Sequence, residues 1–378
     1  MFVIPTIRRN NAVSVQSPTQ SRAAAIISPF VDVTCGGALS LITILGFLIY
    51  AMGKPPAWGQ QIDVGEIMVA NILLNWPHFL ASYRILYRTR ENVRKHPWVA
   101  IVLPAFLVGI FVYGMLTSGR NPPELPGLAN QSMIDVLFPV AVIMLAWHYT
   151  GQSWGMTCSL AFLGGVRLGT TDRVLIRSGF RAMLVFHILW VLQSDDIRPV
   201  MDWLYPGLAS LVETIYTSWL WMLAATFCVG IYGFYRIAKN GNTATAFKAS
   251  VPWLATYAWY ILIYLYPKMF FALQIAHALQ YLIFPLRVEI NQYSQQPGRD
   301  HGHVVRHTIC YYVLLVAIGA LAFDGVLAAT KTADPHRQLS MLLSLAINIH
   351  HYFTDGAVWK IRDPAVRRNL FGHLQQQG

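Results

Sequence analysis

The sequence predicts an all-α, polytopic integral membrane protein, a bundle of about ten transmembrane helices with both termini in the cytoplasm. Three observations predict this class: 55% of the 378 residues are hydrophobic, only 12% are charged, and the basic residues gather in alternate loops. Soluble domains carry roughly twice this share of charged residues. The composition excludes a disordered chain, which would be polar and highly charged, and four cysteines are too few for a disulfide scaffold.

Apolar stretches long enough to cross about 30 Å of hydrocarbon occur along the whole chain. The fifth stretch is short, and we expect its helix to begin earlier, among Arg177 and Arg181. Pro267 separates the seventh and eighth, which are either two helices or one long broken helix, and the second interpretation gives nine spans. The predicted spans are 29–52, 64–87, 97–117, 133–156, 182–194, 214–235, 251–266, 268–286, 308–329 and 339–359.

These spans predict one transmembrane domain over residues 29–360. Residues 1–28 are rich in Ser, Asn and Gln and are predicted to form a flexible basic tail. They lack the continuous apolar core of a cleavable signal peptide. Residues 361–378 are predicted to form a cytoplasmic C-terminal tail.

The basic residues divide unequally between the two sides of this topology, with 22 on the inner side and 6 on the outer side. Cytoplasmic loops of membrane proteins are enriched in Lys and Arg, so the division predicts the orientation in a plasma membrane or bacterial inner membrane. The net charge of +11 is then explained by orientation and by anionic lipid headgroups, and no nucleic-acid partner is expected. The inner residues are Arg8, Arg9, Arg22, the five basic residues from Arg84 to Lys95, Arg167, Arg173, Arg177, Arg181, Arg236, Lys239, Lys248, Arg287, Arg299, Arg306, Lys360, Arg362, Arg367 and Arg368.

Six of the 12 histidines fall inside predicted spans, where an ionisable residue is a functional hypothesis by default. The topology places all six between the membrane centre and the cytoplasmic interface. Imidazoles at one depth on five helices predict a single polyhistidine site, and neutral imidazole is a common metal ligand. The six are His78, His148, His187, His277, His350 and His351.

Helical faces select among these histidines, because a ligand is expected on the polar stripe of its helix. His187 has apolar neighbours and is the weaker candidate, and His350 points roughly 100° away from His351. The predicted metal ligands are therefore His78, His148, His277 and His351, with His350 in reserve. A metal-bound imidazole usually donates its other N–H to a carboxylate or amide, and the candidate partners are Asn75, Gln152, Asn348 and Asp355.

Several imidazoles with few carboxylates favour iron, copper or zinc over magnesium or calcium. Iron held by three or four histidines would leave positions for O₂ and a lipophilic substrate from the bilayer, such as a carotenoid, a quinone, an acyl chain or a sterol. Two other classes remain open: a haem- or chlorin-binding subunit of an electron-transfer complex, and a proton-coupled transporter with a histidine relay. A homo-oligomer or a larger membrane complex is compatible with each class.

Two short segments resemble a known family. Trp76-Pro77-His78 and the run from Trp147 to Gln152 are similar to the Pro-His and His-aromatic-x-Gly-acid/amide signatures of the Brp/Blh-type membrane β-carotene dioxygenases. The resemblance covers only these segments and the general architecture. It implies a histidine-ligated non-haem iron that cleaves a carotenoid with O₂, with the remaining ligands from His277 and the His350-His351 pair. The chain departs from the family's pattern because His277 is not followed by a second histidine one turn on.

Overall fold

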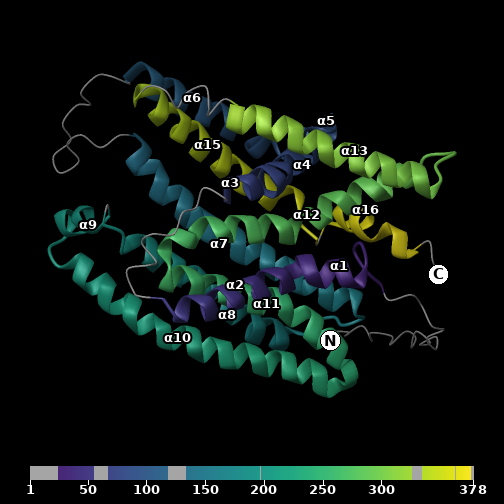
Figure 1. The fold of residues 1–378 in the computed structure, drawn as a ribbon, viewed down its shortest axis with the longest axis horizontal. Helices are drawn as coiled ribbons and strands as arrows, with labels where there is room; N and C mark the ends of the chain where they lie inside the picture. The colour runs from purple at the N-terminus through teal and green to yellow at the C-terminus, as the bar shows by residue number, and fades with distance from the viewer. Residues whose placement is uncertain are drawn as a thin grey trace, which may run out of the picture.

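The computed structural model describes residues 24–54, 67–117, 133–195, 197–325, 334–361 and 363–375, and within these ranges all regular structure is helical (Figure 1). The predicted N-terminal tail lies almost wholly outside these ranges. The helices before the middle of the chain are α1 (Pro29–Val33), η1 (Thr34–Ala38), α2 (Leu39–Met52), α3 (Ile67–Ala70), η3 (Asn71–Asn75), α4 (Trp76–Tyr87), α5 (Arg90–Lys95), η4 (Trp98–Val102), α6 (Leu103–Thr117), α7 (Met133–Leu163) and α8 (Thr170–Leu192). The later helices are α9 (Arg198–Leu204), α10 (Leu208–Ile237), η5 (Ala238–Asn242), α11 (Thr243–Leu265), η6 (Pro267–Met269), α12 (Phe270–Ser294), α13 (His301–Gly319), η7 (Ala320–Gly325), α15 (Asp334–Val358) and α16 (Pro364–Gln375).

Five segments of the described chain are long and apolar enough to cross a membrane, which supports the predicted class of protein. One of them holds two helices, because α10 and α11 are joined by η5, where Gly241 takes a left-handed conformation (φ 84°). The other predicted spans are helical as well, but the number of about ten stays a prediction. The five segments are Pro29–Met52, Thr170–Leu192, Leu208–Leu265, Pro267–Ser294 and His301–Phe323.

One expectation about helix boundaries is confirmed, and one open alternative is decided. The fifth predicted span begins earlier than its apolar core, since α8 starts at Thr170. The seventh and eighth are separate helices, because Tyr266 leaves the helical region (φ −137°, ψ 79°) between α11 and η6. Trp259 before this break and His277 after it both contact the ring of Tyr149 on α7, so the chain reverses direction there.

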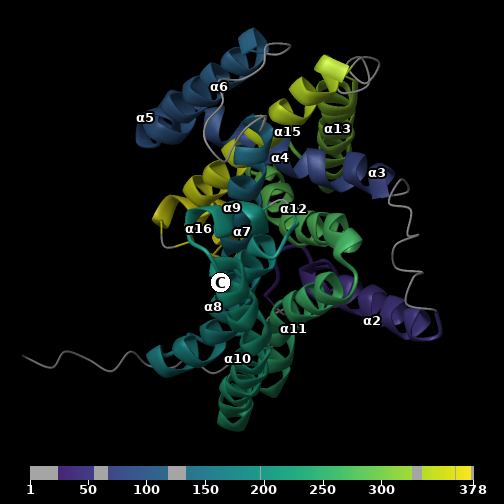
Figure 2. The same cartoon turned by 90° about the vertical axis from the view of Figure 1, so that its left-hand side faces the viewer.

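The long helices run side by side along the longest axis of the molecule (Figure 1), and the end-on view places α7 and α12 near the centre (Figure 2). Helix α11 is largely buried, with Trp253 and Trp259 fully enclosed. Large apolar side chains are instead exposed on α2, α6 and α10, for example Ile42, Phe106 and Trp221. Exposed apolar faces on the outside of a polar-centred bundle suit contact with lipid.

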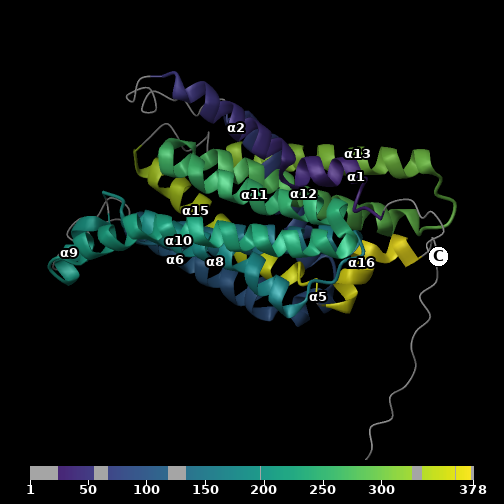
Figure 3. The ribbon, with the colours of Figure 1, turned by 90° about the horizontal axis from the view of Figure 1, so that it is seen from below.

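The two ends of the described chain meet at one end of the bundle, where the view from below shows α16 beside the C-terminal end of α12 (Figure 3). The Asn291 side chain on α12 donates to the backbone carbonyl of Asn369 on α16, at 2.8 Å. His373 Nε2 lies 2.9 Å from the carbonyl oxygen of Ala25, and Arg287 Nε donates to His373 Nδ1. The segment predicted as a C-terminal tail therefore contains a helix packed on the bundle.

A close approach between η1 and α11 depends on glycine. Gly37 has φ 148°, a conformation that L-residues rarely adopt, and a Cβ atom there would lie 2.8 Å from the Cβ of Ala255. The adjacent carbonyl of Gly36 accepts a hydrogen bond of 2.6 Å from Gln280 Nε2 on α12. Helices α11 and α12 are thus both held against the same π-helical turn.

We expect Gly37→Ala to destabilise the protein by about 2 kcal/mol or more, because it combines a strained φ with a steric clash against Ala255. The free energy of unfolding in mixed detergent and SDS micelles measures this. Gly46→Ala on α2 is the matched control, since nothing lies within 4 Å of a Cβ at that position. Equal stability of the two variants would contradict the packing of η1 against α11.

Candidate metal centre

Four helices each direct one imidazole to a common point. His78 lies on α4, His148 on α7, His277 on α12 and His351 on α15, and none of the four is more than 3% exposed. Asp355 lies one turn after His351 and is 2% exposed. We call these five residues the histidine cluster.

The nitrogen atoms that converge are all Nε2. His351 Nε2 lies 3.1 Å from His78 Nε2, and His277 Nε2 lies 3.1 Å from His148 Nε2. Asp355 Oδ2 lies 3.4 Å from His78 Nε2, 3.6 Å from His351 Nε2 and 4.0 Å from His148 Nε2. One ligand atom from each of His78, His148, His351 and Asp355 falls within 4.8 Å of all the others.

These separations match those between ligand atoms around one transition-metal ion. Atoms bonded at about 2.1 Å lie about 3.0 Å apart at a right angle and about 4.2 Å apart when opposite. The close contacts of 3.1 to 4.0 Å fall within that interval, and the 4.8 Å limit for the whole group of four lies a little above it. Nε2 lone pairs facing one another without water repel unless a cation or a proton lies between them, so the donor set and its spacing fit a metal ion.

The position of His78 follows from Pro77. Proline has no N–H, so the carbonyl of Leu73, four residues earlier, loses its helical donor. The backbone forms a π-helical turn over Asn71–Asn75. The Tyr312 hydroxyl on α13 donates a hydrogen bond to the Leu73 carbonyl. Helix α4 then begins at Trp76, with His78 in its first turn facing inward.

Aromatic rings hold the imidazoles in place. Phe79 stacks on His351 with ring centroids 3.8 Å apart and an interplanar angle of 18°. Tyr149 lies against His277 at 4.4 Å, and Tyr352 lies against His148 at 4.8 Å. Rings packed this closely limit rotation of the imidazoles, which pre-organises their nitrogen atoms.

Asp355 is held by an amide. Gln152 Nε2 on α7 donates to Asp355 Oδ2, the oxygen that faces the imidazoles. The next residue, Ser153, donates to Gln280 Oε1 at 2.9 Å, and Gln280 is the side chain that binds the Gly36 carbonyl. Buried hydrogen bonds therefore link the carboxylate side of the cluster to α12 and η1.

Several buried polar atoms at the centre have no hydrogen-bond partner among the described residues. They include the Nδ1 atoms of His78, His277 and His351, and both amide atoms of Asn75. Most buried polar atoms in folded proteins are paired, and unpaired ones mark a missing water or ion. Their concentration here is independent support for a site that holds a ligand or ordered water.

The structure brings together the four histidines that the sequence selected as ligands, and it places the others elsewhere. His350 Nε2 lies 2.8 Å from the Val99 carbonyl, and its ring stacks on Tyr83. His187 is fully buried, but its Nδ1 pairs with the Tyr260 hydroxyl at 3.1 Å. Both therefore lie outside the cluster.

Among the predicted outer partners, Gln152 contacts the cluster through Asp355 rather than through an imidazole. Asn348 bonds Gln274, Tyr352 and the Ser344 carbonyl, so it supports α12 and α15 instead. Asp355 was expected to orient His351 from outside, and its Oδ2 lies among the nitrogen atoms themselves. The i, i+4 spacing of His351 and Asp355 was the available signal for this, because such residues share one helix face.

Two of the other histidines make ion-pair contacts close to α13. His303 pairs with Asp300 at the start of α13, and His307 pairs with Glu289 at 2.7 Å. Glu289 also binds Arg84 at 2.9 Å, so it ties α4, α12 and α13 together beyond the cluster. The side chain of His336 lies outside the described residues.

The chain matches no protein-family model, no curated protein and no solved structure. The function must therefore be argued from the cluster and its surroundings.

We expect His148→Ala to abolish high-affinity metal binding, because it removes one of the converging nitrogen atoms. His187→Ala is the matched control: it removes an equally buried imidazole outside the cluster and should leave the metal content unchanged. Elemental analysis of the purified variants measures the metal per chain, and thermal unfolding reports whether each variant folds. Full metal content in folded His148→Ala would refute the site.

Proposed function

We propose that the chain is an integral membrane oxygenase or oxidase that uses a histidine-ligated metal, non-haem iron in the first instance, to oxidise or cleave a lipophilic substrate. One observation carries this proposal: three imidazole nitrogens and one carboxylate oxygen converge, with the His277 imidazole beside His148, inside a bundle with lipid-suited outer faces. The predicted orientation puts this centre in the cytoplasmic half of the bilayer.

The donor set supports a redox-active transition metal. Imidazole with a single carboxylate is typical of iron, copper and zinc sites, whereas magnesium and calcium prefer oxygen donors. A bound iron would supply O₂ activation at positions that the protein leaves free. The cluster's own residues would fix the ion, and the rings of Phe79, Tyr149 and Tyr352 would keep bulk water from it.

Burial in the membrane supports a lipophilic substrate. The cluster residues are at most 3% exposed, and the exposed apolar faces of the bundle place any approach between its helices in contact with lipid. A carotenoid, a quinone or an acyl chain can arrive laterally from the bilayer. The resemblance of the Trp76-Pro77-His78 and Trp147–Gln152 segments to carotene dioxygenases makes a carotenoid the first substrate to test.

The spacing of the imidazoles bears differently on the two alternative functions, a haem protein and a proton relay. A haem macrocycle is far wider than the gap between imidazoles whose Nε2 atoms are 3.1 Å apart, so the spacing disfavours haem. A proton relay is favoured by the same two contacts, because imidazoles at hydrogen-bond distance can pass protons. The metal content of the wild-type protein separates a relay from an oxygenase.

We expect the purified protein to contain iron without a Soret band and to consume O₂ when a carotenoid is supplied. Removal of the metal with a chelator should abolish O₂ uptake, and added Fe²⁺ should restore it, because a bound iron would supply the O₂ activation. An O₂ electrode, an absorption spectrum and product analysis measure these outcomes. A Soret band would contradict the non-haem site, and absence of any transition metal would favour the relay.

The orientation gives a separate expectation. A fluorescent protein fused after Gly378 should fold and fluoresce in bacterial cells, and alkaline phosphatase fused at the same place should be inactive, because the inner loops carry the basic residues. The opposite pair of results would invert the topology.

A further inference from the structure

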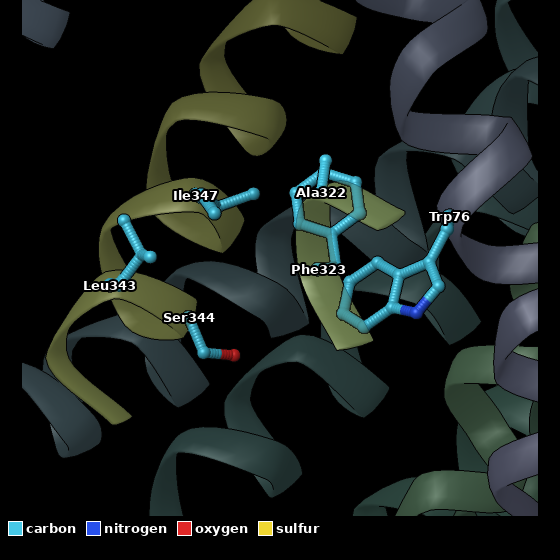
Figure 4. A pocket seen from close by; sticks show the side chains of 6 residues that line it. All are labelled: Trp76, Ala322, Phe323, Leu343, Ser344 and Ile347. Atoms are coloured by element: carbon cyan, nitrogen blue, oxygen red, sulfur yellow. The ribbon is translucent and has the colours of Figure 1, made fainter. Parts of the chain in front are cut away.

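Helix α13 supplies none of the residues of the histidine cluster, yet α13 and the adjoining η7 contact the start of α4 and the turn before it. The Tyr312 hydroxyl donates to the carbonyl oxygen of Leu73. A Cβ atom at Gly319 would lie 2.7 Å from the Cβ of Trp76, so the two helices are close there. Phe323 stacks on the Trp76 indole with ring centroids 4.4 Å apart, and Figure 4 shows these two rings side by side. All three contacts fall in the few residues that precede the metal ligand on α4.

Helix α13 packs on the side of α4 that is turned away from the cluster. A Cβ atom at Gly319 would lie 3.6 Å from the Leu80 side chain, and the Arg84 guanidinium lies 4.8 Å over the ring of Tyr311. Leu80 and Arg84 follow His78 by two and six residues, which at about 100° per residue places both roughly opposite it. Helix α4 is therefore held between the cluster on one side and α13 on the other.

The Leu73 carbonyl needs a hydrogen-bond donor from outside its own helix. The Trp76 N–H bonds the Asn71 carbonyl, five residues earlier, and Pro77 has no N–H to offer. The Leu73 side chain is 46% exposed on a surface suited to lipid, where no water is present to bond a free carbonyl. The hydroxyl of Tyr312 takes the place of the missing donor.

The π-helical turn over Asn71–Asn75 sets the direction in which His78 points. Such a turn closes five residues back instead of four, so it holds one residue more than an α-helical turn. A return to α-helical geometry would rotate α4 by about 100° relative to α3. His78 Nε2 would then leave its place 3.1 Å from His351 Nε2. The ligand atoms converge only while the wide turn is kept.

We propose that Tyr312 is a positioning residue for the metal centre, an inference that rests on the metal site of the proposed function. Its hydroxyl supplies the hydrogen bond that Pro77 cannot, which holds the wide turn and keeps His78 Nε2 directed at the other ligand atoms. The close packing of α13 and η7 on Trp76 keeps this hydroxyl within reach. Tyr312 acts through the backbone and touches neither the metal nor a substrate.

Binding of Co²⁺ to the metal-free full-length protein in lipid nanodiscs tests this role, because the visible absorption of Co²⁺ reports its ligand geometry. Tyr312→Phe removes the hydroxyl and keeps the ring. It should weaken Co²⁺ binding roughly tenfold and change the absorption spectrum, as loss of an outer support does at other metal sites. Tyr257→Phe is the matched control. It also loses a hydroxyl contact, with Thr226 at 3.1 Å, but lies on α11, which carries no cluster residue, and should bind Co²⁺ as the wild type does.

A rescue separates positioning from a general loss of stability. Pro77→Ala restores an N–H four residues after Leu73, so that the carbonyl no longer depends on Tyr312. In the Pro77→Ala background, Tyr312→Phe should therefore leave the Co²⁺ affinity and spectrum almost unchanged. Thermal unfolding reports whether each variant is folded. An equal loss of affinity in both backgrounds overturns the proposal, and so does a wild-type affinity and spectrum in Tyr312→Phe alone.

The same measurements distinguish failure of the inference from failure of the proposed function. A wild-type protein that binds no Co²⁺ refutes the metal site and the inference with it. Equally tight binding by the wild type and by Tyr312→Phe upholds the site and refutes only the role of Tyr312. O₂ uptake enters neither measurement, so the oxygenase is tested separately.

Discussion

The convergence of four imidazoles and one carboxylate inside an apolar bundle is the constraint on which the rest of the structure depends. Each group loses its hydration on burial, which costs several kcal/mol for an ion without a partner. Each neutral imidazole carries one N–H, on Nδ1 or on Nε2. Where the N–H groups lie on Nδ1, the Nε2 lone pairs and the Asp355 carboxylate face and repel one another. A bound cation removes this conflict, and the closely packed rings of Phe79, Tyr149 and Tyr352 keep the donors aligned for it.

The helices around the cluster carry features that serve its geometry. The π-helical turn before Pro77 sets the start of α4, and with it the direction of His78. Gly155 on α7 makes room for the Tyr281 hydroxyl, which would lie 2.9 Å from a Cβ at that position. Gly151, one turn earlier, has open space beside it, so no close neighbour requires a glycine there. The π-helical turn at Asn71–Asn75 and the missing side chain at Gly155 thus both lie where the geometry of the site requires them.

Hydropathy and depth were enough to predict much of this site. In a membrane protein each long apolar run must be a helix, because the backbone has no water to bond, and depth then follows from counting residues. This reasoning selected His78, His148, His277 and His351, and the structure places these four together. It also ranked His187 as the weaker candidate because of its apolar neighbours, and the structure turns that imidazole toward Tyr260 and Phe270.

Other features depend on contacts that periodicity does not contain. The π-helical turns add single residues that a 3.6-residue pattern does not resolve, and the stacking of Phe323 on Trp76 joins distant parts of the chain. The helix in the C-terminal segment was missed because its sequence is polar on most sides, and it is stabilised by Leu370 and Phe371 packing into the main core. A helix of this kind is stabilised by packing against a partner, here α12, and the sequence alone does not give the position of that partner.

The place of Asp355 has a consequence for the chemistry of the centre. It is the one carboxylate that the structure shows near the converging nitrogens, and neutral imidazoles add no charge. A divalent ion would therefore keep a formal charge of about +1 in surroundings of low dielectric, where an uncompensated charge is costly. Such a centre favours an incoming ligand that is anionic or that becomes anionic during reaction, and O₂ accepting electrons is of that kind.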